Sequence, residues 1–348
     1  MRLIVFVFVF FSGAVLAQDG SYSVYLVGDA GEDTTSGHAL LMLKRQLDKD
    51  PRSAVIFLGD NVYPSGFSNN SPKSRLHLES QLNILKKYKG RVYFIPGNHD
   101  WDAQRRRGLD KVKQQKMHID NYLQNNSAVV NKEDGCFFPA EGLPGPVSVM
   151  LNEKLRLIMI DTQWFLHFHK KNKIGSKKQT VKIFYERLDS LLRLSSGNGE
   201  QVIIAAHHPV YTNGSHARRM QPWRFMVNCT PFKILGFCGL DRLFSQDIYQ
   251  PGYRRMRSRL LASMKEYNNI IYASGHDHNT QCFKEEGKRF IVSGNGSKVT
   301  KLRKKKRFDS VFQDDQLTGF VKLEFSEDKK ITTKIYRVGM DVKLLEAY

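Results

Sequence analysis

Apolar and polar residues follow two alternating patterns along most of the chain. Short runs of β-branched and apolar residues predict strands at residues 22–27, 54–58, 92–95, 155–160, 201–205 and 270–273. Between these runs, apolar residues spaced by three and four positions predict helices at residues 37–47, 73–88, 177–194 and 254–267. Strands and helices that alternate in this way define the α/β class, in which helices connect parallel strands.

The pattern changes from residue 287 onward. Extended segments follow at residues 289–293, 319–325 and 331–338 without a helix between them, and we expect them to complete a sheet edge in antiparallel orientation. No internal repeat and no long linker divides the chain, which predicts a single domain over residues 18–348. A long aromatic and basic stretch at residues 211–253 is predicted to be an insertion that forms a lid, a binding loop or a peripheral flap.

The first residues have the pattern of a signal peptide. Arg2 precedes an unbroken apolar run, and small residues around Ala17 suit a cleavage site. Residues 1–17 are therefore predicted to be cleaved during export, and the mature protein is predicted to be periplasmic or secreted. The apolar stretch at residues 3–17 is shorter than the roughly 20 residues that span a bilayer, and no later segment comes closer. An uncleaved membrane anchor is the alternative interpretation.

Composition places the chain among folded globular proteins, because 41% of its 348 residues are hydrophobic and 25% are charged. The charge is unbalanced: 54 Lys and Arg against 34 Asp and Glu give a formal net charge of +20. Basic runs lie at residues 105–107, 254–259 and 298–307. They are either solvated faces or surfaces that attract anionic substrates, an anionic envelope or a nucleic acid.

Four cysteines could form disulfides in three pairings if the protein is exported: Cys136, Cys229, Cys238 and Cys282. Cys229 and Cys238 would close the shortest loop. Free buried thiols are the alternative. Since no C-x-x-C pair occurs, the sequence does not support a zinc ribbon or a thioredoxin-type redox centre.

Several predicted strands end in a glycine followed by a residue that can bind a metal ion: Gly28-Asp29, Gly59-Asp60, Gly97-Asn98-His99 and Gly275-His276-Asp277-His278. Glycine permits a sharp exit from the strand, and open α/β sheets bind ligands at the carboxyl ends of their strands. A fifth segment, Ala206-His207-His208-Pro209, also follows a strand. A single Gly-Asp pair is usually a polar turn, whereas five such strand ends predict a dinuclear metal site.

These motifs resemble those of the calcineurin-like metallophosphoesterases, and among them the small, tartrate-resistant purple acid phosphatases. The resembling stretches are GDAG (28–31), GDNVYPSG (59–66), GNHDW (97–101), AHHPVYTNGSH (206–216) and GHDHNTQ (275–281). The resemblance implies an α/β fold, a four-layer α/β/β/α sandwich with two mixed sheets. The chain departs from the family pattern at Glu32 and Ala206, where glycine is usual.

The resemblance also implies two sets of metal ligands and two further site residues. The first set is Asp29, Asp60, Tyr63 and His278. The second set is Asp60, Asn98, His207 and His276. His207 is preferred to His208 because its distances from Pro209 and His216 match the family's spacing. His99 and His216 would face the substrate, and outside this motif Tyr63 would be read as a core aromatic residue.

The charges of the two sets suit different ions. Two carboxylates and a phenolate carry three formal negative charges, which suit Fe(III), whereas the second set suits Fe(II), Zn or Mn. Asp60 could bridge ions roughly 3.5 to 4 Å apart. The implied activity is hydrolysis of phosphate monoesters, on phosphorylated small molecules or proteins, by attack of a metal-bound hydroxide. The alternatives are a phosphodiesterase or nuclease with the same site, and a polyanion-binding protein with a relic site.

Overall fold

The computed structural model describes residues 21–32, 38–139, 141–167, 176–217 and 246–345. The predicted signal peptide at residues 1–17 and the larger part of the predicted insertion, with Cys229 and Cys238, lie outside these ranges. A search of the described ranges for a helix long and apolar enough to cross a membrane finds none.

The first of two mixed sheets has the strand order β13-β12-β11-β1-β2-β3. Its strands are β1 (Tyr22–Val27), β2 (Ser53–Phe57), β3 (Arg91–Phe94), β11 (Gly319–Phe325), β12 (Ile331–Arg337) and β13 (Lys343–Leu345). The strands β1, β2 and β3 run parallel to one another, and β11 joins β1 in antiparallel orientation. The carboxyl ends of β1, β2 and β3 therefore lie at one edge of this sheet.

The second sheet has the order β10-β8-β9-β7-β6-β5-β4. Its strands are β4 (Val147–Asn152), β5 (Leu155–Met159), β6 (Gln201–Ala205), β7 (Ile270–Ser274), β8 (Thr280–Glu285), β9 (Lys288–Ser293) and β10 (Phe312–Asp314). The strands β5, β6, β7 and β9 are parallel, while β4, β8 and β10 are antiparallel to their neighbours.

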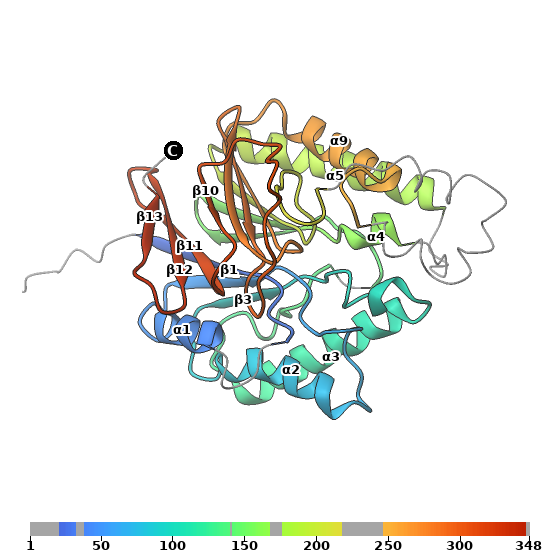
Figure 1. The fold of residues 1–348 in the computed structure, drawn as a ribbon, viewed down its shortest axis with the longest axis vertical. Helices are drawn as coiled ribbons and strands as arrows, with labels where there is room; N and C mark the ends of the chain where they lie inside the picture. Colours follow the sequence, from blue (N-terminus) through green and yellow to red (C-terminus); the bar gives the residue numbers. More distant parts are fainter. Residues whose placement is uncertain (1–20, 33–37, 140, 168–175, 218–245, 346–348) are drawn as a thin grey trace, which may run out of the picture.

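Helices cover the outer face of each sheet, which gives four layers (Figure 1). The helices against the first sheet are α1 (His38–Leu47), α2 (Pro72–Asn83) and α3 (Gly108–Asn126), with the short 3-10 helix η1 (Asp102–Gln104) before α3. Those against the second sheet are α4 (Gln163–Leu166), α5 (Lys177–Gly197) and α9 (Pro251–Met264). This arrangement confirms the predicted α/β/β/α sandwich.

Each sheet separates two apolar cores. In β2, Val55 and Phe57 pack with the helices, whereas Ala54 and Ile56 pack between the sheets. Because successive side chains in a strand point to opposite faces, a strand buried on both faces must be apolar at every position. This double burial explains why the strands appear in the sequence as unbroken apolar runs.

Two expectations from the sequence need correction. The helix expected to extend to Tyr88 ends at Asn83. The apolar residues Leu85 and Tyr88, which suggested a longer helix, are buried but lie in the non-helical segment that follows α2. The segment at residues 289–293 is not an antiparallel edge strand: as β9 it lies inside the second sheet, parallel to β7. The antiparallel strand β8, which was not predicted, reverses the chain between β7 and β9.

The described cysteines do not pair with each other. Cys136 is buried in the core between the first sheet and its helices, and Cys282 is buried between the two sheets. Burial raises the pKa of the Cys136 thiol to about 12. Cys136 is therefore a packed, unreactive thiol, as the alternative of a buried thiol expects for this residue.

Candidate metal centre

The predicted site residues come from loops at the carboxyl ends of parallel strands in both sheets. Asp29, Asp60 and Asn98 follow β1, β2 and β3, while His207 follows β6 and the His276–His278 loop follows β7. Their side chains meet between the two sheets, and Asp29, Asp60 and His207 lie close enough together to hold one metal ion. Asp29 and His207 are fully buried, and Asp60 is 1% exposed.

Three of these residues have an unusual backbone conformation. Asp29, Asp60 and His276 have positive φ angles of 58°, 55° and 70°. This left-handed region is uncommon for residues other than glycine and costs free energy, and such residues concentrate at functional sites. Next to them, a Cβ atom on Gly97 would lie 2.2 Å from Oδ1 of Asp60, so only glycine permits this close approach.

One cluster of donor atoms surrounds the hydroxyl of Tyr63. This oxygen lies 2.8 Å from Oδ1 of Asp29, 3.0 Å from Oδ2 of Asp60 and 3.0 Å from Nε2 of His278. A hydroxyl has one proton, so it cannot donate to all three groups. Burial and the two carboxylates raise the pKa of Tyr63 well above its ordinary value of 10. A bound cation would reverse this effect, and the four atoms fit one.

A second cluster surrounds Oδ1 of Asn98, which lies 2.9 Å from Nε2 of His207 and 3.0 Å from Nδ1 of His276. The other ring nitrogens face backbone carbonyls, of Leu58 at 2.9 Å from His207 and of Gln246 at 3.4 Å from His276. Nε2 of His207 and Nδ1 of His276 also lie 3.3 Å from each other. Two imidazole nitrogens and a carboxamide oxygen therefore converge on one point, and all three are atoms that can bind a metal ion.

Asp60 connects the two clusters. Its Oδ2 faces Tyr63, while its Oδ1 lies 3.5 Å from Nε2 of His207. Although burial disfavours the charged carboxylate, His207 and His99 hold the pKa of Asp60 well below its usual range. Burial likewise opposes a charge on His207, but Asp60 raises the pKa of His207 to about 9. The structure thus brings all seven predicted ligands together in two groups that share one carboxylate.

His99 and His216 lie at the rim of the same centre, one beside each cluster. The ring of His99 packs on Tyr63 with centroids 4.4 Å apart, and its backbone N–H donates to Oδ1 of Asp60 at 2.8 Å. The ring of His216 packs on His276 at 4.2 Å. Each of the two side chains is 30% exposed, so both can reach a molecule that enters from solvent.

Asp277 lies in the motif after β7 but was given no role from the sequence. It is fully buried and accepts hydrogen bonds from the hydroxyls of Thr212 at 2.5 Å and Ser215 at 3.3 Å and from the backbone N–H of His216 at 3.2 Å. Its carboxylate therefore fixes the loop that carries His216. Burial opposes a charge on His216, but Asp247 and Asp277 raise its pKa above the ordinary value. The place of Asp277 in the motif after β7 was the available sequence signal, and its burial shows the supporting role.

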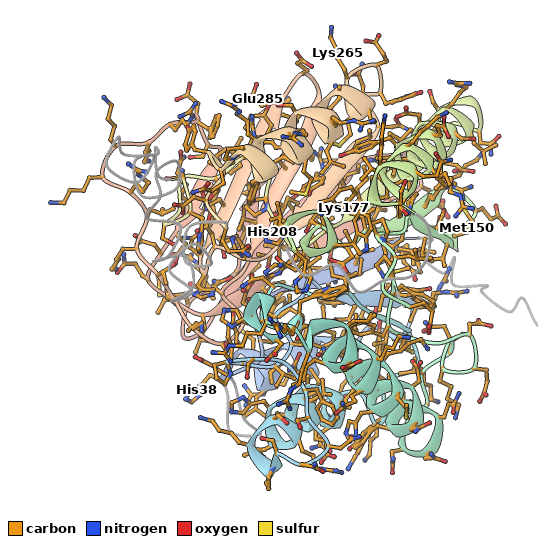
Figure 2. All side chains as sticks on the ribbon, turned by 90° about the vertical axis from the view of Figure 1, so that its right-hand side faces the viewer. His38, Met150, Lys177, His208, Lys265 and Glu285 are labelled. Atoms are coloured by element: carbon orange, nitrogen blue, oxygen red, sulfur yellow. The ribbon has the colours of Figure 1, made fainter. Side chains whose placement is uncertain are left out.

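Asp100 and His208 are buried next to the proposed ligands and hydrogen-bond to the surrounding loops. Asp100 accepts hydrogen bonds from the backbone N–H groups of Asn61 at 3.1 Å and Gly97 at 2.8 Å, and these bonds connect the loops after β2 and β3. Burial and the nearby charge of Asp60 raise the pKa of Asp100 to about 7. His208 lies in the middle of the molecule (Figure 2) between Thr162 and Gln246, at 2.8 and 2.6 Å. It is thus a packed, hydrogen-bonded side chain.

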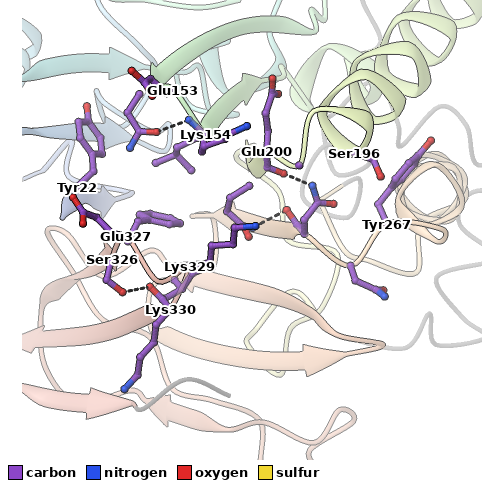
Figure 3. A pocket seen from close by; sticks show the side chains of 18 of the residues that line it. Tyr22, Glu153, Lys154, Ser196, Glu200, Tyr267, Ser326, Glu327, Lys329 and Lys330 are labelled. Carbon is purple, nitrogen blue, oxygen red and sulfur yellow. Dashed lines mark hydrogen bonds between the residues drawn. The ribbon is translucent and has the colours of Figure 1, made fainter. Parts of the chain in front are cut away.

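A cavity of about 1010 Å³ lies away from these donors. Figure 3 shows that side chains of both charges line it, among them Lys154, Glu200 and Glu327. Tyr22 and Gln201, the first residues of β1 and β6, also line it. Since it is at the amino ends of the parallel strands, it is separate from the candidate metal centre.

Residues 22–280 match the model of the calcineurin-like phosphoesterase family, and the chain belongs to that family. It is accordingly a metal-dependent phosphoester hydrolase by family, and Asp29, Asp60 and His207 form a group that could hold a metal ion.

Similar proteins extend this comparison. The chain is 22% identical over 297 residues to purple acid phosphatase 17 of Arabidopsis thaliana, covering 81% of this chain and 70% of that protein. Among solved structures, GAP50, described as the anchor in the inner membrane complex of Plasmodium, has a TM-score of 0.56 at 16% identity and covers 94% of this chain and 89% of its own. A dimetal phosphatase from Danio rerio has a TM-score of 0.53 at 12% identity and covers 94% and 99%. At these identities the structures share the fold.

Proposed function

We propose that this protein is an exported phosphomonoesterase with a dinuclear metal centre. The observation that carries the proposal is the pair of donor clusters that share Asp60, each with several metal-binding atoms within hydrogen-bond distance of one another. Asp29, Asp60, Tyr63 and His278 would hold one ion, and Asp60, Asn98, His207 and His276 the other. When bound, the two ions would act as Lewis acids and lower the pKa of a bound water toward roughly 7.

The donor sets favour different ions in the two positions. The set with two carboxylates and the Tyr63 phenolate favours Fe(III), because hard anionic oxygens suit a trivalent cation. The set with Asn98 and two imidazoles carries less charge and favours Fe(II), Zn or Mn.

The two rim histidines would bind and protonate the substrate. His99 packs beside the first cluster and His216 beside the second, and both are partly exposed, so we assign both to contact oxygens of the substrate's phosphate group. Asp247 lies 3.6 Å from Nδ1 of His216 and favours its charged form. His216 is therefore the group we assign to hold the proton that the departing alcohol oxygen receives.

The test compares an aryl phosphate monoester with the corresponding bis-aryl diester on metal-loaded protein. We expect a higher kcat/KM for the monoester. A strong preference for the diester would replace the proposal by a phosphodiesterase or nuclease. Protein that holds both metals, hydrolyses neither ester and binds heparin or DNA would instead be a polyanion-binding protein with a relic site.

Export is the second part of the proposal and rests on the signal-peptide pattern at residues 1–17. Mature protein isolated from its natural source should begin at Gln18. A mature chain that retains Arg2 would contradict cleavage and favour the membrane anchor. We also treat residues 18–348 as one domain with an insertion at residues 211–253, which should remain a single cooperative unit in thermal unfolding.

A further inference from the structure

The basic run at residues 298–307 lies beside the candidate metal centre. The backbone N–H of Thr300 donates to the carbonyl of His278 at 2.7 Å. The ammonium group of Lys298 lies 3.5 Å from the ring centroid of Tyr63. The start of this run is therefore in contact with two residues of the first donor cluster.

The far end of the run is fixed to the loop that carries His216. The buried carboxamide oxygen of Asn213 accepts the backbone N–H groups of Arg307 at 2.8 Å and Phe308 at 3.0 Å. The backbone N–H of Arg303 donates to the carbonyl of Asn213 at 3.0 Å. The basic run thus contacts the first donor cluster at its start and is hydrogen-bonded near its end to Asn213, three residues before His216.

The run carries many charges, and all of them are positive. It contains seven basic residues and no acidic one: Lys298, Lys301, Arg303, Lys304, Lys305, Lys306 and Arg307. Lys298 pairs with Glu32 at 3.2 Å and Lys301 with Asp315 at 3.7 Å. Within the described part of the chain, no carboxylate forms an ion pair with any of residues 303–307. Neighbouring like charges repel one another, so this stretch attracts an anionic partner.

The arginines and lysines of this surface have different surroundings. The guanidinium group of Arg307 lies 4.3 Å from the ring centroid of Tyr249, and that of Arg257 lies 5.1 and 5.6 Å from those of Tyr211 and Phe308. Recognition of single-stranded nucleic acid uses open aromatic faces on which bases stack. Among the described residues of this surface, the rings of Tyr211, Tyr249 and Phe308 each have a guanidinium group over them. In contrast, the three lysines at 304–306 are exposed. Flexible ammonium groups suit carboxylates or phosphates without bases.

We propose that residues 298–307 form a docking surface for an acidic peptide segment and that the preferred substrates are phosphopeptides with several acidic residues next to the phosphorylated one. This inference rests on the proposed phosphatase function and names the substrate class for the same site. Lys298 is adjacent to the centre, and Lys304, Lys305 and Lys306 extend the positive surface for the flanking acidic residues.

The test uses the triple variant Lys304→Gln, Lys305→Gln, Lys306→Gln. The control is Lys86→Gln, Lys87→Gln, Lys89→Gln, which removes the same charge from three exposed lysines just before β3, at the opposite end of the sheet. Two phosphoserine peptides, one flanked by glutamates and one by glutamines, are assayed as substrates at low salt. An unphosphorylated glutamate peptide is titrated separately by fluorescence anisotropy.

We expect the first triple variant to lose about tenfold in kcat/KM for the glutamate peptide and to retain its activity on the glutamine peptide, since exposed charges act mainly on encounter with a charged partner. Its Kd for the unphosphorylated peptide should rise by a similar factor, while the control should match wild type in both measurements. Raising the salt to 0.5 M should remove the difference in each.

Two results would overturn the inference. One is a triple variant that binds the unphosphorylated peptide as tightly as wild type. The other is tighter binding of a single-stranded oligonucleotide than of a peptide of equal charge, which would indicate a nucleic-acid surface. Failure of the phosphatase proposal would look different: the acidic peptide would bind wild type and depend on Lys304–Lys306, yet neither phosphopeptide would be hydrolysed.

Discussion

Tyr63 is buried in a way that packing alone does not explain. Its ring is 2% exposed, but its hydroxyl points at two carboxylates and an imidazole rather than at apolar groups. Placing a phenol there is costly unless a cation takes the place of the proton. The position therefore favours the ligand role over that of a core aromatic residue.

We expect the Tyr63→Phe variant of iron-loaded protein to lose its visible colour while it retains some iron and some phosphatase activity. A phenolate is electron-rich and Fe(III) is electron-poor, so charge transfer between them should colour the wild type purple to pink. Phe removes the electron donor and leaves Asp29, Asp60 and His278 in place. The measurement is the visible spectrum alongside iron analysis. A colourless wild type, or a variant that keeps the band, would remove Tyr63 from the iron site.

The His216→Ala variant should keep both metal ions and lose about 10²- to 10⁴-fold in turnover, the usual range for a general acid. Its ring contacts His276 from the rim of the centre, so its removal leaves the donor atoms in place. Metal content and kcat are the two measurements. A variant with wild-type turnover would show that another group protonates the leaving oxygen.

The glycines at the strand ends drew attention to several of the candidate donors, and the resemblance to the calcineurin-like metallophosphoesterases assigned all seven to the two sets. The sequence did not show the supporting roles of Asp277, Asp100 and Asn213, although all three lie within the quoted motifs. Those roles depend on burial and on partners that are distant in the chain. Asn213 also begins a glycosylation sequon, but both of its carboxamide atoms are hydrogen-bonded inside the protein.

Strands and helices were predictable to different degrees. The strands β1, β6 and β11 begin and end where the apolar pattern places them, because both of their faces are buried. The helix α3 was missed: only a few of its residues are buried, among them Val112, Ile119 and Leu123, which gives a weak pattern. Which sheet each strand joins was not predictable, since β9 and β11 have similar apolar patterns and pair in different sheets.

The strands β5 and β6 are joined at their amino ends by a bidentate ion pair. Nε and Nη2 of Arg156 donate to the two carboxylate oxygens of Glu200 at 2.6 and 3.0 Å, and the side chains are 12% and 5% exposed. The hydrogen bonds from Arg156 lower the pKa of Glu200 to about 2. A carboxylate with a lowered pKa in the folded state stabilises the protein above its unfolded pKa, and this stabilisation is lost as the pH falls toward 2.

The Glu200→Gln variant should therefore be less stable than wild type by about 1.5–3 kcal/mol at pH 7, the size of a hydrogen bond to a charged group. The difference should shrink between about pH 4.5 and pH 2, because unfolded wild type then binds a proton that the folded protein does not. Urea unfolding of both metal-free proteins at pH 7 and pH 3 measures it. An equal difference at the two pH values would show that the ion pair has no net effect on stability.

The whole molecule depends on the candidate centre as a junction between its two sheets. Asp29, Asp60 and Asn98 belong to loops of the first sheet, and His207, His276 and His278 belong to loops of the second. Apolar residues of both sheets form a continuous core beneath them. At the strand ends this core gives way to buried polar groups, and ions bound there would connect the sheets where apolar packing ends.

Metal loading should consequently raise the melting temperature of the entire protein. A ligand that binds only the folded state stabilises it by about 2.7 kcal/mol at a hundredfold excess over its Kd. For a chain of this size that corresponds to a rise of roughly 4 °C. The Asp60→Asn variant should lose most of this rise, because Asp60 is the one residue that both donor clusters share.

The matched control is Asp341→Asn, at an exposed residue just before β13. This variant should melt like wild type with and without metal. Calorimetry of chelator-treated and reloaded protein measures the shifts, and an Asp60→Asn variant that gains as much from metal as wild type would show that Asp60 does not bridge the two clusters.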